Sequence, residues 1–117
     1  MAFGSNNTSK SVWDSLLEVQ QEITVPSAVR SGDASATANF IKNMRDTCVK
    51  HGLLLVFDEE ISRKNNEYFA STASVTQIED TDDETDTLET AAYGKLGGEN
   101  ATLFARADAA LGLLGLG

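Results

Sequence analysis

The chain has 117 residues, with eighteen acidic side chains against nine basic ones and a formal net charge of −9. This length suffices for one domain with a single two-layer core, but not for two independently folding units. The acidic balance has the wrong sign for binding nucleic acid through phosphate contacts alone. Seven of the acids, however, lie between residues 79 and 89, and the rest of the chain is near neutral.

The content of cysteine and histidine excludes two further classes of protein. Cys48 is the only cysteine, so no intramolecular disulfide forms, and the single His51 cannot build a metal site from several histidines. Residues 1–10 are polar and read as a flexible lead without an apolar signal region. No apolar run is long enough to span a bilayer. We therefore expect a protein of the reducing cytoplasm that is neither secreted nor membrane-embedded.

Two helices are predicted before any strand. Ser11 is placed to cap the first, with Asp14 three residues later, and Pro26 closes it. Its apolar stripe comprises Val12, Leu16, Val19 and Ile23. Asp33 or Ser35 caps the second helix, and Gly52 stands where a left-handed residue ends it. The apolar side of that second helix carries Phe40, Ile41, Met44 and Cys48, and its outer side carries Lys42, Arg45 and Lys50.

Three strands are expected next, beginning with the apolar run 53–57. The charged residues 58–60 and 63–66 predict a turn, and 68–78 predicts a second strand with one wet face. The acidic residues between them make a hairpin tip before a third strand at 87–93. Gly94, Gly97 and Gly98 are expected to break the sheet. The last helix is expected to bury one face, made of Leu103, Phe104, Ala107, Ala110, Leu111 and Leu114.

The expected fold class is therefore α+β: two N-terminal helices, a three-stranded antiparallel sheet and a C-terminal helix packed on it, in one domain over residues 11–117. No catalytic constellation accompanies it. Residues 80–91 fail the calcium-loop pattern, because Thr85 and Ala91 stand where a glycine and a glutamate are needed. His51 reads as a cation near a helix carboxyl end. Four aromatic residues are weighed as base-stacking groups against the commoner role of core packing: Trp13, Phe40, Tyr68 and Phe69.

Several stretches resemble a known family in order and spacing. These are Ser-Val-Trp-Asp-Ser-Leu-Leu-Glu-Val-Gln-Gln at 11–21, Lys-His-Gly-Leu at 50–53, Leu-Glu-Thr-Ala-Ala-Tyr-Gly at 88–94, and Gly-Glu-Asn-Ala at 98–101 before an alanine-rich helix. Over residues 11–116 the chain resembles the essential recombination function (ERF) family of phage single-strand annealing proteins. Asn100 stands where that family usually has a basic residue, and Arg106 is the only base of the last helix.

This resemblance implies a protein that binds single-stranded DNA and anneals it in phage-type recombination, in the cytoplasm of a host cell. It implies a homo-oligomer, as a ring or filament, with no cofactor and no bond-making chemistry, hence no enzyme. A phage nuclease or a host single-strand-binding protein is an expected partner. The phosphate contacts we expect under this resemblance are Lys42, Arg45, Arg63, Lys64 and Lys95, weighed evenly against plain surface solvation.

Two other readings stay open at this point. A self-assembling structural protein, such as a virion or filament component, suits an acidic chain that ends in an apolar helix. The stretch 104–111 also loosely resembles the last helix of diguanylate cyclases, but the nucleotide-binding and metal-binding parts of that family are missing. Salt-sensitive binding of single-stranded DNA separates an annealing protein from a structural one, which assembles without DNA.

Overall fold

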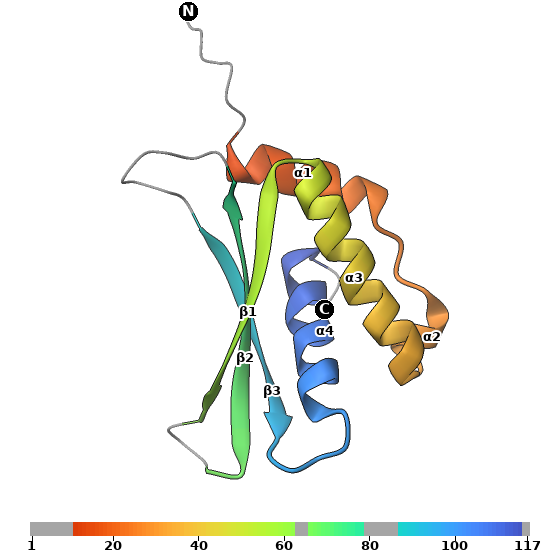
Figure 1. Ribbon diagram of the computed structural model, residues 1–117, viewed down its shortest axis with the longest axis vertical. Coiled ribbons are helices and arrows are strands. Elements are labelled where there is room, and N and C mark those ends of the chain that lie inside the picture. The colour runs from red at the N-terminus through yellow and green to blue at the C-terminus, as the bar shows by residue number, and fades with distance from the viewer. Residues whose placement is uncertain (1–10, 63–65, 79–86, 116–117) are drawn as a thin grey trace, which may run out of the picture.

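A computed structural model describes residues 11–62, 66–78 and 87–115 (Figure 1). The predicted α+β class is confirmed, with a three-stranded antiparallel sheet and a C-terminal helix packed on it. The elements in chain order are α1 (Val12–Glu22), α2 (Ser27–Arg30), α3 (Ala34–Lys50), β1 (Leu53–Ile61), β2 (Tyr68–Gln77), β3 (Leu88–Lys95) and α4 (Ala101–Leu113). The lead at 1–10 and most of the acidic hairpin tip lie outside the described residues.

The predicted helix boundary signals mostly hold. The Ser11 hydroxyl accepts a hydrogen bond from the Asp14 amide at 3.1 Å, so it caps α1. The Asp33 carboxylate caps α3 in the same way, accepting from the Ala36 amide at 2.9 Å. Gly52 follows α3 with a φ of +80°, the left-handed conformation that a glycine adopts without steric cost.

Two features of the helical part differ from the prediction. α1 ends at Glu22, so Ile23 is its extended C-cap residue and not part of the helix. After Pro26 the chain forms the four-residue α2, which the sequence analysis did not predict. Proline closes one helix because it lacks an amide proton, but its fixed φ also suits the start of the next. Over residues 11–52, three helices therefore precede the sheet instead of two.

The first strand is longer than predicted, and the turn expected at residues 58–60 is wrong. β1 continues through Asp58, Glu59 and Glu60 to Ile61 and pairs with β2 over its full length. Side chains alternate between the two faces of a strand, so those of Asp58 and Glu60 lie on one face of the sheet and that of Glu59 on the other. Glu59 is stabilised there by Arg106 of α4, a partner 47 residues away in the chain. Local charge alone gave no sign of that pairing.

The expected break at Gly94 is also wrong. Gly94 lies within β3, opposite Phe69 of β2. A Cβ atom at position 94 would lie 2.4 Å from Cζ of Phe69, so only glycine leaves room for that ring. Gly94 thus permits a close cross-strand contact within the sheet and does not end it. The strand ends one residue later, at Lys95.

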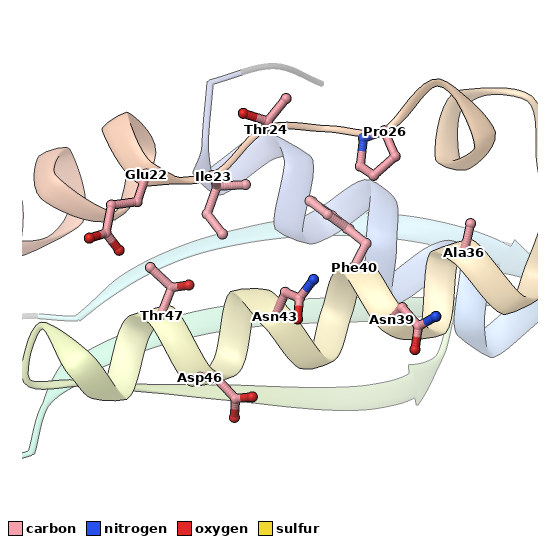
Figure 2. Close-up of a pocket in the computed structure, with 10 residues that line it drawn as sticks. All are labelled: Glu22, Ile23, Thr24, Pro26, Ala36, Asn39, Phe40, Asn43, Asp46 and Thr47. Atoms are coloured by element: carbon pink, nitrogen blue, oxygen red, sulfur yellow. The ribbon is translucent and has the colours of Figure 1, made fainter.

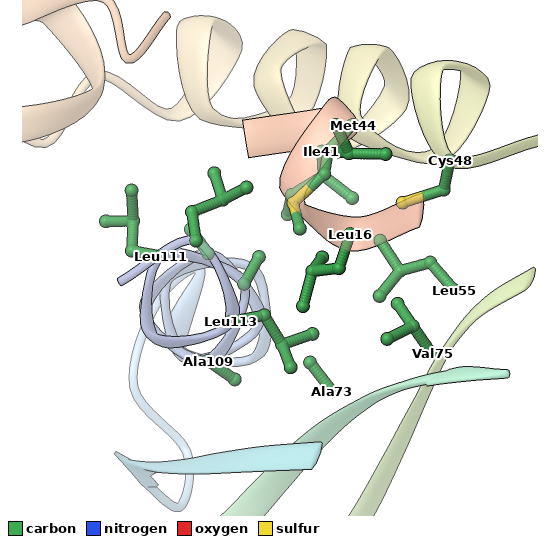
Figure 3. Close-up of a cluster of buried hydrophobic side chains, with 14 of the residues drawn as sticks. Leu16, Ile41, Met44, Cys48, Leu55, Ala73, Val75, Ala109, Leu111 and Leu113 are labelled. Atoms are coloured by element: carbon green, nitrogen blue, oxygen red, sulfur yellow. The ribbon is translucent and has the colours of Figure 1, made fainter. Parts of the chain in front are cut away.

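The molecule has two layers, with the helices on one face of the sheet and no described element on the other (Figure 1). The sheet order is β1-β2-β3, and β1 and β3 are its edges. Between the layers, side chains of α1, α3, β1 and β2 meet the alanines and leucines of α4 (Figure 3). Fully burying one Leu or Val side chain contributes roughly 1.5–3 kcal/mol. Among the described residues, no helix is long and apolar enough to cross a bilayer.

Candidate nucleic-acid interface

The sheet face that the helices leave uncovered, called the open face below, presents alternate side chains of all three strands. At its end nearest the β1–β2 connection lie Tyr68 of β2 and Tyr93 and Lys95 of β3. Tyr93 is 66% exposed and Tyr68 is 40% exposed, and Lys95 is exposed as well. We call these three residues the tyrosine–lysine patch.

The strand register fixes the geometry of this patch. Tyr68 lies directly opposite Lys95, and Tyr93 lies opposite Ala70, two residues along β2 from Tyr68. The two tyrosines are therefore diagonal neighbours, which in antiparallel pairs lie roughly 7–8 Å apart and remain within reach of aromatic side chains. Two aromatic rings beside one ammonium group supply the two contacts that single-stranded nucleic acid needs, base stacking and phosphate neutralisation.

The middle of the open face is acidic. Asp58 and Glu60 of β1 and Glu89 of β3 surround Thr72 and Ser74, around a shallow hollow of about 230 Å³. These carboxylates repel phosphate, so they restrict an anionic ligand to the end of the sheet that carries the patch. Within the described ranges, no group of three or more histidine, cysteine, aspartate or glutamate side chains is arranged to hold a metal ion.

Two of the five predicted phosphate contacts lie in the helix layer and not on the open face. Lys42 pairs with Asp46 one turn along α3, at 3.0 Å between Nζ and Oδ2, with both side chains largely exposed. The guanidinium carbon of Arg45 lies 5.2 Å from the centre of the Phe57 ring, a cation–π contact on the covered side of β1. The sheet thus separates both residues from the patch.

Lys95 is the one predicted contact that the described residues place on the open face. Arg63 and Lys64 lie outside the described residues, in the connection between β1 and β2, and their role stays a prediction. The three predicted phosphate contacts that the structure describes, Lys42, Arg45 and Lys95, therefore do not form one surface. A phosphate held at Lys95 is beyond the reach of Lys42 and Arg45, whose side chains belong to the other layer.

The aromatic residues divide into core and surface. Phe40 and Phe69 are buried, which agrees with the commoner role of packing and leaves neither ring exposed for base stacking. Trp13 is 59% exposed, but it belongs to α1, which lies at the end of the molecule opposite the β1–β2 connection (Figure 1). Tyr93 was not among the residues predicted from the sequence to stack on bases. The signal was present, because the two-residue spacing of Glu89, Ala91, Tyr93 and Lys95 puts them on one face of a strand.

Arg106, the only base of α4, forms an ion pair within the protein. Its Nε and one terminal nitrogen donate to both oxygens of Glu59, at 2.9 and 2.8 Å, and Ser71 donates to the same carboxylate at 2.9 Å. The Arg106 guanidinium first, and the Ser71 hydroxyl to a smaller degree, lower the pKa of Glu59 below its usual range. A guanidinium whose two nitrogens already donate to a carboxylate is a poor phosphate ligand, because those hydrogen bonds must first be broken.

His51 and Cys48 have structural surroundings. His51 is the C-cap residue of α3, with Nδ1 2.9 Å from a Glu18 oxygen and Nε2 3.2 Å from a Glu22 oxygen. Lys50 also pairs with Glu22, at 2.7 Å, so these contacts join α1 to the end of α3. Cys48 is fully buried, and burial raises the pKa of its thiol to about 11. Such a thiol is an inert core group and not a nucleophile.

A groove of about 450 Å³ lies between α3 and the segment that joins α1 to α2 (Figure 2). Figure 2 shows Asn39, Asn43 and Asp46 along the α3 side, with Glu22 at one end. No basic side chain lines this groove among the described residues. Its carboxylates make it unsuitable for phosphate, so the tyrosine–lysine patch remains the better nucleic-acid candidate.

No family model, no curated protein and no solved structure matches this chain.

Proposed function

We propose that this protein binds single-stranded DNA on the open face of its sheet and anneals complementary strands, in phage-type homologous recombination. The observation that carries the proposal is the tyrosine–lysine patch, two exposed rings beside an ammonium group on a face that no described helix covers. The resemblance of residues 11–116 to ERF annealing proteins supports the same function. The proposed activity makes and breaks no covalent bond, so the protein is not an enzyme in this account.

The patch suits annealing because of which parts of the DNA it contacts. Stacking on Tyr68 and Tyr93 uses the flat faces of bases, and Lys95 neutralises the phosphate between them. The hydrogen-bonding edges of the bases then remain available to a complementary strand. Contacts of this kind are tolerant of sequence, because every base has a flat face.

One copy of the chain is expected to bind weakly. Lys95 is the only basic residue that the described part of the open face presents, and the neighbouring acids oppose phosphate. Affinity therefore depends on several copies engaging one strand, since linked weak sites raise overall binding by an effective-concentration effect. This is consistent with the ring or filament that the resemblance implies.

The test measures fluorescence anisotropy of a labelled single-stranded oligonucleotide at low and moderate salt. We expect salt-sensitive binding, and Tyr93→Ala to weaken it roughly tenfold, because one base stack on an aromatic ring is worth about 1–3 kcal/mol. Tyr93→Phe retains the stack and should retain affinity. The matched control is Trp13→Ala, which removes a similarly exposed aromatic side chain from α1 and should leave binding unchanged.

Adding the complementary strand then tests annealing itself. The protein should accelerate duplex formation, and Tyr93→Ala should reduce that acceleration in proportion to the lost binding. Absence of binding at low salt, or equal losses in Tyr93→Ala and Trp13→Ala, would overturn the proposed interface.

A second candidate function is a self-assembling structural protein. It is favoured by the exposed aliphatic side chains Leu54 and Val56 at the other end of the open face, together with the acidic net charge. Assembly into large particles without DNA, combined with no salt-sensitive DNA binding, would favour this candidate over annealing.

A further inference from the structure

β3 is an edge strand with an unpartnered side. Among the described residues it pairs only with β2, so the backbone N–H and C=O groups along its outer side have no strand beside them. Its eight residues contain no proline and no bulge, two devices that natural proteins use to block such edges. An edge of this kind is a template for pairing with another chain.

The charges of β3 are complementary to themselves under a two-fold axis. If two copies of β3 run antiparallel with the axis at Ala92, Glu89 lies opposite the partner's Lys95, and symmetry repeats the pair. Ala91 then lies opposite the partner's Tyr93, and small residues meet at the centre of the contact. Opposite charges placed directly across an antiparallel pair stabilise it.

Other registers of the same pairing lack this match. Moving the axis to Ala91 puts Glu89 opposite Tyr93 of the partner subunit, and moving it to Tyr93 puts Lys95 opposite Ala91 of the partner subunit. A slip by one residue is excluded, because only alternate residues of β3 direct their N–H and C=O groups to its outer side, so residues of one face can pair only with residues of the same face. The charge pattern therefore selects the axis at Ala92.

The other edge of the sheet has no such complementarity. On the open face β1 carries Leu54, Val56, Asp58 and Glu60, with no base among them. Two copies joined through β1 gain no ion pair in any register and bring their acids near one another. A head-to-tail contact of β1 with a neighbour's β3 gives at most one ion pair, between the partner's Lys95 and either Asp58 or Glu60.

We propose that this protein forms a two-fold dimer by antiparallel pairing of β3 with the β3 of a second copy, centred on Ala92. The two sheets become one continuous sheet, in which the two Tyr93 residues are diagonal neighbours across the axis and the two Lys95 residues lie at opposite ends of the paired strands. The Lys95 ammonium has three donors, so it can contact the partner's Glu89 and a phosphate together. Dimerisation needs no nucleic acid and stands apart from the proposed function.

The first experiment is sedimentation velocity of the DNA-free protein and its charge variants. We expect a dimer for the native chain, and Glu89→Lys and Lys95→Glu each to raise the dissociation constant tenfold or more by opposing like charges. The double variant with both changes should restore the dimer, because the two residues face each other across the axis. Glu60→Lys is the matched control and should leave the dimer unchanged.

These variants distinguish the two modes of contact. If Glu60→Lys disrupts assembly and the double variant fails to recover it, the head-to-tail contact is correct and the two-fold dimer is wrong. A monomeric native chain at high concentration also overturns the proposal. Because no DNA is present, neither outcome bears on the DNA binding measured with Tyr93→Ala, which leaves both ion pairs intact.

A cross-linking experiment tests the register directly. A chain with Ala91→Cys and Tyr93→Cys should form disulfide-linked dimers under mild oxidation, because directly opposite residues in an antiparallel pair lie about 4.5–5.5 Å apart, within disulfide range. Tyr93→Cys alone should not, because its counterpart is diagonal to it. Efficient cross-linking of the single variant would place the axis at residue 93 and overturn the proposed register.

Discussion

Glu59 shows how one charged residue on the covered face holds a strand to a helix. Its carboxylate accepts two hydrogen bonds from Arg106 and one from Ser71, so β1, β2 and α4 meet at a single group. Arg106 also lies with its guanidinium carbon 5.4 Å from the centre of the Phe57 ring. Partly buried charges are stabilising only when paired and hydrogen-bonded in this way.

Replacing Glu59 therefore has a pH-dependent effect. Because its folded-state pKa is lowered, the pair stabilises the protein above the usual glutamate pKa, and that contribution is lost as the pH falls through the folded value. We expect Glu59→Gln to reduce the free energy of unfolding by about 1 kcal/mol at pH 7. The difference from the native chain should shrink at a pH well below the usual glutamate pKa of about 4.3, where the native carboxyl becomes protonated. Urea denaturation at both pH values measures it.

Glu60→Gln is the control for this measurement, because it removes the same charge from the next residue, on the open face. It should change stability far less at pH 7. A gap between Glu59→Gln and the native chain that stays constant across the pH range would show that the effect comes from lost packing and not from the ion pair.

Gly94 carries the second residue-scale prediction. A Cβ atom there would lie 2.4 and 2.6 Å from two carbons of the Phe69 ring, so Gly94→Ala displaces the ring or the strand. We expect a loss of about 1–3 kcal/mol in the free energy of unfolding, the usual cost of overpacking. Chemical denaturation of Gly94→Ala, Phe69→Leu and the double variant forms the test. If the ring contact is the cause, the alanine should cost less in the Phe69→Leu background.

At the scale of elements, the start of α3 depends on one side chain. The Asp33 carboxylate satisfies the Ala36 amide, one of the donors that a helix start leaves without a helical partner. We expect Asp33→Ala to destabilise the protein by about 1 kcal/mol, and Asp33→Asn to cost much less because its amide oxygen also caps. Ser35, the rival cap in the sequence, is exposed. Ser35→Ala should therefore have little effect, and equal midpoints for all variants in thermal unfolding would contradict the assignment.

Local signals explain which elements the sequence predicted. Ser11, Asp33 and Gly52 act on backbone groups within a few residues, and each marks a helix boundary in the structure. The errors involve distant partners. Residues 58–60 read as a turn because Arg106 is far along the chain, and Gly94 reads as a break because the Phe69 ring that requires it belongs to another strand.

The candidate interface was predictable only in part for the same reason. Lys95 was identified as a base, but its neighbours on the open face depend on the register of β2 and β3, which fixes Tyr68 opposite it. Tyr93 becomes a candidate only when β3 extends past Gly94 to Lys95. The sequence also predicted Lys42 and Arg45 as phosphate contacts, because they are basic, but the fold places both in the helix layer.

At the scale of the whole molecule, the two layers divide the charges unevenly. The described bases of α3 and α4 lie in the helix layer, where Lys42, Lys50 and Arg106 each pair with an acid. The open face keeps Asp58, Glu60 and Glu89 around its centre and Lys95 at one end. Single-stranded DNA bound to this face as proposed would therefore be attracted at the patch and repelled by the acids beside it.

Removing one of these acids should strengthen DNA binding. Glu60 of β1 lies opposite Ala70 of β2, and Ala70 lies opposite Tyr93 of β3. Two strand spacings therefore separate Glu60 from Tyr93, a distance of roughly 10 Å. Two unit charges at that distance in water interact by about 0.4 kcal/mol. Glu60→Gln should thus raise affinity for a single-stranded oligonucleotide about twofold at low salt, and the gain should vanish near 1 M salt, where the screening length is about 3 Å.

Asp108→Asn provides the matched comparison, because it removes one charge from an exposed residue of α4, in the other layer. If the DNA lies on the open face, anisotropy titrations should show a gain for Glu60→Gln and a much smaller one for Asp108→Asn. Equal gains would mean that only the net charge of the protein matters, and the strand would then have no defined position on the sheet. A gain for Asp108→Asn alone would place the DNA on the helix layer, near the bases that the sequence first indicated.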